Sequence, residues 1–262
     1  MCVGICALFI FGCGFPTSMS GQTLKQSAKF DLPGPGGKRL KIAGGIDEAQ
    51  LQEQSAAIKA LNLQFVRSGT NLTVLRSIEL NLNPDGQGDM ESASLRRLDL
   101  VLGCFHSSLR KKADQTPRYL AALRNPDIQI LGHPRSRIYN FREGLQADWQ
   151  TVFSTAADLG KAVEIDGYPD RQDLNIELLR IARSTGVRIS LGTDSHGPAQ
   201  LRFMDFCAAA ALIAGIPAAS ILNYMDKDAL CGWVDDLRSK IRPSAMPRNK
   251  RKLCLKNATV DV

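Results

Sequence analysis

Short apolar runs alternate with segments of helical periodicity from about residue 44 to residue 240, and this alternation limits the folds open to the chain. The runs that we expect to form strands are 73–82, 98–105, 128–132, 161–166 and 187–192. The segments that we expect to form helices are 46–62, a short stretch in 91–97, 116–125, 149–160, 174–186, 198–215 and 227–240. Strand and helix alternate at least five times, which is typical of an α/β domain.

The polar residues at the ends of these runs favour a barrel over an open sheet. His106, His133, Asp166 and Asp194 each lie at or just beyond the C-terminal end of an expected strand. Barrel enzymes collect active-site groups from several strands at that end. An open doubly wound sheet concentrates them at one switch point. We therefore expect a barrel-like fold.

Histidine is rare in this chain, and its three copies occupy similar places. His106, His133 and His196 each follow an apolar run. Any one of them alone is more often a hydrogen-bonded core or turn residue, but three imidazoles at one end of a fold can bind zinc, manganese or iron. Glu79 lies within an expected strand, where alternation leaves it either inward or on the surface. Asp194 is a fifth candidate ligand, with capping of the following turn as the alternative.

Five segments, in order, carry a resemblance to a known family. They are IELNLNPDG (78–86), LDLVLGCFHSS (98–108), NPDIQILGHPRSR (125–137), AVEIDGYPDRQDL (162–174) and ISLGTDSHGPAQL (189–201). Together they resemble the polymerase-and-histidinol-phosphatase (PHP) family, in particular the C-terminal PHP domain of bacterial family X DNA polymerases. KIAGGIDEAQLQEQ (41–54) is similar to the segment that follows the second histidine motif of that domain.

The resemblance implies a distorted seven-stranded (β/α) barrel that hydrolyses phosphoesters with up to three divalent metal ions, zinc or manganese. Carried over by motif, it makes Glu79 a bridging ligand and completes one metal site with His106 and His133. Asp194 would belong to a second site and His196 to a third. No protein nucleophile is then required, because metal ions activate water and clamp the phosphoryl oxygens.

Four further residues lie in the matching motifs. Arg137 and Arg171 are candidates for binding the phosphate, where negative charge accumulates, and each could equally be a surface ion-pair partner. Asp166 and Asp170 are expected to orient ligands or loops rather than to bind metal.

The first metal motifs of the family have no counterpart in this sequence. The family begins with a His-x-His pair, a further histidine and an Asp-His-Ser motif, but His106 is the first histidine here. We therefore expect a barrel incomplete at its N-terminal strands, fewer metal ions and impaired catalysis. Residues 1–38 do not match and are expected to be disordered or translated out of frame. Residues 39–238 are expected to form the truncated PHP domain, and residues 239–262 a basic tail.

These observations predict a metal-dependent phosphoesterase of the 3′-5′ exonuclease or DNA-end-processing type. The alternatives are a non-catalytic DNA-binding or regulatory remnant, and a small-molecule phosphatase of the histidinol-phosphatase type. A formal net charge of +7 favours acidic partners such as DNA or another phosphate ester. Seven cysteines without a CxxC pair, and an apolar start without a preceding basic residue, favour the cytoplasm over export or a membrane.

Overall fold

A parallel sheet lies at the centre of the computed structural model, which describes residues 10–11 and 45–240. Its strands are β3 (Ser77–Asn81), β4 (Leu100–Cys104), β5 (Ile130–Leu131), β6 (Ala162–Asp166) and β7 (Arg188–Gly192). A separate antiparallel pair joins β1 (Ile10–Phe11) to β2 (Thr73–Val74). The predictions for residues 1–38 and 239–262 concern segments that lie almost entirely outside the described residues.

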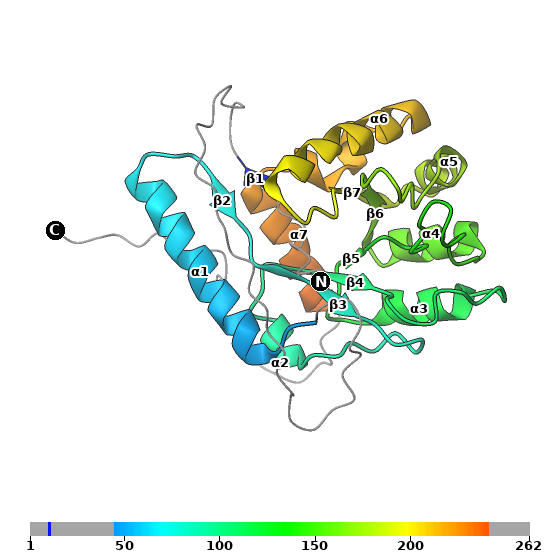
Figure 1. The fold of residues 1–262 in the computed structure, drawn as a ribbon, viewed down its shortest axis with the longest axis horizontal. Coiled ribbons are helices and arrows are strands. Elements are labelled where there is room, and N and C mark those ends of the chain that lie inside the picture. Colours follow the sequence, from blue (N-terminus) through cyan, green and yellow to red (C-terminus); the bar gives the residue numbers. More distant parts are fainter. Residues whose placement is uncertain (1–9, 12–44, 241–262) are drawn as a thin grey trace.

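Each strand of the sheet pairs in parallel with the next one along the chain (Figure 1). Such consecutive pairing is the order found in (β/α) barrels, whereas a doubly wound sheet reverses its order at a switch point. The α/β class is confirmed, and the five strands are consistent with part of a (β/α) barrel.

Two of the predicted strands are shorter than expected. The run 73–82 is interrupted at Leu75 and Arg76, between β2 and β3. Arg76 donates its backbone N–H to Asp99 Oδ2 at 2.8 Å, and its guanidinium pairs with the same carboxylate at 2.7 Å. The Asp99 side chain thus takes a backbone donor that a strand ladder would otherwise use. The run 128–132 pairs only at Ile130–Leu131.

Helices connect and flank the strands. They are α1 (Glu48–Arg67), α2 (Ser92–Leu95), α3 (Thr116–Arg124), α4 (Trp149–Asp158), α5 (Ile176–Thr185), α6 (Met204–Ala214) and α7 (Lys227–Lys240). The helix predicted for 198–215 begins as a 3₁₀ turn, Pro198–Phe203, before α6. Among the described residues, no helix is both long and apolar enough to cross a membrane.

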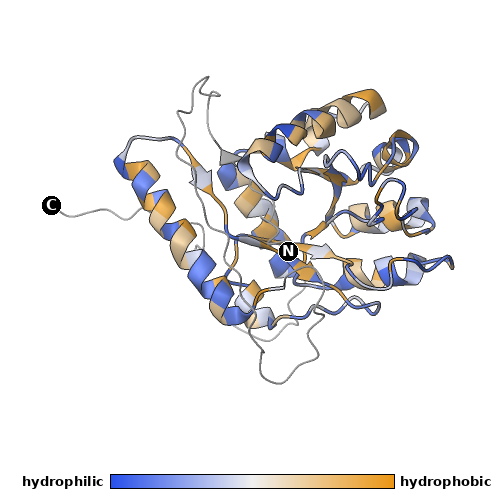
Figure 2. Cartoon of the chain, in the orientation of Figure 1, coloured by the Kyte–Doolittle hydropathy of each residue, from blue (hydrophilic) through white to orange (hydrophobic). Residues whose placement is uncertain are grey.

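The two faces of the sheet are covered differently. Helices α3, α4, α5 and α6 form an arc along one side of the strands, and α7 lies on the other (Figure 1). The arc of helices buries the larger core, which includes Ile78 and Leu80 of β3. The buried apolar residues of α3, α4 and α5 belong to this core, whereas α6 is apolar over most of its surface (Figure 2) and exposes Leu212 and Ile213. We call the opposite, α7-covered side the inner face.

The inner face is apolar at one end and polar at the other. Leu100, Leu102 and Ile130 pack against Leu230 and Val234 of α7. Toward the C-terminal ends of the strands, the residues that alternate with the main core are polar instead: Glu79, Asn81, Glu164, Asp166 and Ser190. Side chains on one strand face alternate with a period of two, so these groups converge above the apolar part covered by α7.

Buried Lys161, just before β6, gives the fold a testable dependence on pH. Its ammonium donates to the carbonyl of Asn125. Burial lowers the pKa of Lys161 from 10.5 to about 7, against a smaller opposing effect of Asp127. Between these values the unfolded chain binds a proton that the folded chain does not, so the free energy of unfolding should rise with pH. This one group contributes at most about 1.4 kcal/mol per pH unit.

Urea unfolding at about pH 7, 8 and 9 measures this effect. Lys161→Met should remove the part of the rise that comes from the buried ammonium. Lys59→Met, at an exposed position of α1, should leave it in place. Equal pH dependence in the two variants would contradict the assignment.

Candidate metal centre

Glu79 stands at the middle of β3 and faces the inner side of the sheet. Its neighbours Ile78 and Leu80 point into the main core, so alternation directs Glu79 to the other face. The side chain is only 18% exposed. Of the two orientations left open by the sequence, the inward one is therefore observed.

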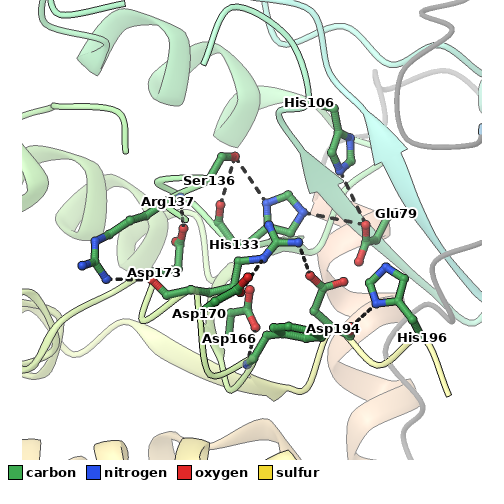
Figure 3. Close-up of polar contacts among 12 residues, drawn as sticks. Glu79, His106, His133, Ser136, Arg137, Asp166, Asp170, Asp173, Asp194 and His196 are labelled. Atoms are coloured by element: carbon green, nitrogen blue, oxygen red, sulfur yellow. Dashed lines mark hydrogen bonds and ion pairs between the residues drawn. The ribbon is translucent and has the colours of Figure 1, made fainter. Parts of the chain in front are cut away.

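His106 and His133 both approach the Glu79 carboxylate (Figure 3). Nε2 of each imidazole lies 3.7 Å from Glu79 Oε2. The two rings meet edge to face, with centroids 5.1 Å apart. His106 follows β4 and His133 follows β5, so three neighbouring strands bring these groups together.

The orientation of both rings is set by surrounding groups. His106 Nδ1 lies 2.5 Å from Asn81 Oδ1, and a donor at Nδ1 leaves the Nε2 lone pair directed at Glu79. The backbone N–H of His133 donates to Glu164 Oε2 at 2.6 Å. Ser136 Oγ lies 3.4 Å from His133 Nδ1. These partners hold the two Nε2 atoms at the carboxylate.

Burial and charge set the protonation of the centre. Burial tends to raise the pKa of Glu79, but the hydrogen bond and charge of His133 and the charge of His106 lower it to about 2. Burial and the His133 charge lower the pKa of His106 to about 4. The pKa of His133 lies well above its usual value, because Cys104 and Glu79 outweigh the effect of burial. Ionised Glu79 and neutral His106 are the forms that bind a divalent cation, whereas His133 would release its proton on binding one.

Cys104 is a potential ligand that the sequence analysis did not single out. Its Sγ and one ligand atom each of Glu79 and His133 all lie within 4.8 Å of one another. The signal was present in the sequence: Cys104 lies in the predicted strand that leads into His106, two residues before it. It is also the register partner of Asn81.

Asp194 and His196 belong to the loop after β7 and make different contacts. Asp194 Oδ2 lies 2.6 Å from Arg171 Nη2, which forms a largely buried ion pair. His196 is exposed, and its Nδ1 lies 2.7 Å from the backbone oxygen of Asp194 (Figure 3). The structure therefore brings Asp194 and Arg171 together near the polar end of the inner face. The described contacts of the His196 ring are with the Asp194 backbone oxygen and, edge to face, with the Tyr168 ring.

The arginines predicted to bind phosphate are placed unequally. Arg171 reaches Asp194, and the Asp194 charge helps to raise its pKa against the effect of burial. Arg137 instead donates from Nη1 to the backbone oxygen of Arg171 at 2.8 Å, and points away from Glu79 (Figure 3). Arg142, which no sequence motif marked, donates to the backbone oxygen of Ser136, and its charge is among those that lower the pKa of His106.

Three further aspartates contact the loops around the centre. Asp173 is fully buried and accepts the backbone N–H groups of Arg135 at 2.8 Å and Arg137 at 2.9 Å. Asp166 Oδ1 accepts the N–H of Tyr168 at 2.8 Å. Asp170 has an exposed side chain, and its carboxylate lies 3.8 Å from Arg171 Nε. Asp173 thus fixes the loop that follows His133, a role that the sequence analysis did not assign.

Comparison with known proteins places this chain in a family. No family model matches the chain. The chain is 30% identical over 185 residues, 70% of its length, to "DNA polymerase/3′-5′ exonuclease PolX" of Bacillus subtilis (strain 168). It is 29% identical over 134 residues, 48% of its length, to a "Probable phosphatase" of Caldicellulosiruptor saccharolyticus. The chain is of the PHP type.

A third relative of this PHP-type chain is a "Probable phosphatase" of Photobacterium profundum, 30% identical over 135 residues, 48% of this chain. The matched regions make up 32% of the Bacillus protein, 54% of the Caldicellulosiruptor protein and 52% of the Photobacterium protein. The PHP-type chain therefore spans about a third to a half of the length of these relatives.

Proposed function

We propose that this chain is a phosphoester hydrolase in which Glu79, His106 and His133 hold one divalent cation. The observation that carries this proposal is the approach of two imidazole Nε2 atoms to the same carboxylate oxygen, each at 3.7 Å. Ligand atoms of a tetrahedral site with bonds of about 2.0–2.1 Å lie roughly 3.3–3.4 Å apart, so a small inward movement of the side chains would close the shell. A cation held there would supply an activated water and polarise a phosphoryl oxygen.

We further propose one ion rather than the three of the complete family pattern. The chain contains three histidines, and two of them are already committed to Glu79. Asp194 is neutralised by Arg171, whose fixed positive charge replaces the charge that a second ion would bring. His196 Nδ1 faces a backbone oxygen of its own loop.

Two arginines near the polar end of the inner face, Arg142 and Arg171, are proposed to bind the phosphate. Arg171 is the sequence candidate that lies beside the centre, and Arg142 joins it from the loop after β5. A guanidinium offers paired donors that match phosphate oxygens. Arg137, tied to the backbone of residue 171, is proposed to position that loop instead.

The substrate that the surface favours is a nucleic-acid strand, as in a 3′-5′ exonuclease or end-processing enzyme. The loop after His133 exposes Tyr139 and Phe141, whose residues are 58% and 60% accessible. The Arg137 guanidinium lies 5.2 Å from the centre of the Tyr139 ring, and that of Arg110 4.8 Å from the Phe141 ring. Exposed rings beside arginines are the usual platform for unpaired bases and their phosphates. A small phosphomonoester would use neither ring.

Hydrolysis assays with added Mn²⁺ or Zn²⁺ test this proposal. The full chain should cleave bis(p-nitrophenyl) phosphate and shorten a 5′-labelled single-stranded oligonucleotide from its 3′ end, and His133→Ala should abolish both reactions. Cleavage of phosphomonoesters alone would favour the small-molecule phosphatase. If wild type and His133→Ala are equally inert while both bind the oligonucleotide, the chain is a non-catalytic binding module.

A further inference from the structure

Cys104 occupies the boundary between the two halves of the inner face. It ends β4 and is fully buried. Below it, Leu102 and Ile130 pack against α7 in the apolar cluster that also contains Cys104. On its other side lie Glu79 and His133. One ligand atom of each and Cys104 Sγ are all within 4.8 Å of one another.

The Cys104 sulfur lies so close to Gly132 that residue 132 has no room for a side chain. A Cβ added to Gly132 would lie 2.4 Å from Cys104 Sγ, so a side chain at residue 132 would displace the sulfur. Gly132 directly precedes His133, and its lack of a side chain lets the thiol approach that imidazole. Cys207, the other buried free thiol in the described part of the chain, differs, because its Sγ donates to the backbone oxygen of Gly192 at 3.0 Å. The ligand atoms within 4.8 Å of the Cys104 sulfur belong to Glu79 and His133, side chains that can bind metal.

We infer that Cys104 is a further protein ligand of the cation held by Glu79, His106 and His133. This inference rests on the proposed metal site and adds the class of metal that the site prefers. Binding replaces the thiol proton of Cys104, which passes to solvent, by a sulfur–metal bond. One sulfur, one nitrogen and one oxygen, from Cys104, His133 and Glu79, already lie within 4.8 Å of one another. His106, whose Nε2 is 3.7 Å from Glu79 Oε2, would move in to add a second nitrogen. This donor set suits tetrahedral zinc rather than manganese or magnesium.

If Cys104 is a thiolate ligand, the site should bind zinc more tightly than manganese. Sulfur is a soft donor, so its removal weakens binding of zinc far more than binding of manganese. Cys104→Ser should reduce zinc affinity by at least about 10- to 100-fold, since even the loss of a group that only supports a ligand costs that much. Manganese affinity should change little.

Cobalt(II) reports on sulfur ligation directly, without an activity assay. The full chain, stripped of metal and loaded with Co²⁺, should show an intense near-ultraviolet sulfur-to-cobalt charge-transfer band. Cys104→Ser should lose that band, and Cys207→Ser, at the other buried free thiol, should keep it. Circular dichroism of each variant verifies the fold, and the wild-type spectrum is informative even if Cys104→Ser does not fold.

The possible outcomes separate this inference from the proposed function. Bound Co²⁺ without the band would show that Cys104 is only a small apolar core residue, and the metal site would stand without it. A band that survives in Cys104→Ser or disappears in Cys207→Ser would also overturn the assignment. No Co²⁺ binding at all would overturn the metal site and the inference together.

Discussion

Replacing Glu79 by glutamine should reduce phosphodiester hydrolysis by at least about 100-fold, the upper end of the effect of losing a group that merely supports a metal ligand. The reason is electrostatic as well as geometric. Glu79 is the carboxylate that both imidazoles approach, and its amide analogue has almost the same shape but no charge. Metal analysis of the purified chain should accordingly find one tightly bound ion in the wild type and none in Glu79→Gln.

The matched control for this variant is Glu177→Gln, an exposed glutamate in the first turn of α5. It should retain both the ion and the hydrolysis rate. Full metal content in Glu79→Gln would exclude Glu79 as a ligand. Three tightly bound ions in the wild type would instead contradict the single-ion proposal and show that other groups complete the family pattern.

Replacing Leu230 by alanine should lower the free energy of unfolding by about 2–5 kcal/mol, the usual cost of emptying a buried leucine site. Leu230 of α7 is almost completely buried in the cluster with Leu100 and Leu102. That cluster is the apolar support beneath the polar end of the inner face. Urea unfolding followed by circular dichroism measures the change.

Leu212→Ala provides the comparison on the opposite side of the sheet. Leu212 of α6 is 81% exposed, so its truncation should change the free energy of unfolding by no more than about 0.5 kcal/mol. A similar, small effect at Leu230 would mean that α7 is not packed on the inner face in solution.

Much of the fold could be predicted because its signals are local. β6 and β7 end where the sequence predicted and begin one residue later, and α7 has the bounds predicted for it. The break before β3 could not be predicted, since it depends on Asp99, a residue far along the chain that takes the backbone donor of Arg76. A contact between a side chain and the backbone over this sequence separation is visible only once the chain is folded.

The candidate centre was predictable to the extent that strand ends define it. His106 and His133 follow neighbouring strands, so their meeting at Glu79 follows from topology. The partner of Asp194 did not follow, because Arg171 reaches it from another loop. Arg142 carried no signal at all, since it lies in an irregular loop whose path depends on buried Asp173 and Ser136.

The position of α7 has a consequence for how this chain is made. A ribosome delivers β4 and β5 first and α7 last, so the apolar part of the inner face is complete long before Leu230 and Val234 exist to cover it. At about 5–20 residues per second, that surface is uncovered for on the order of ten seconds during synthesis. The nascent chain is therefore a natural client for chaperones that bind exposed apolar strands, and its yield in cells should depend on how soon α7 emerges.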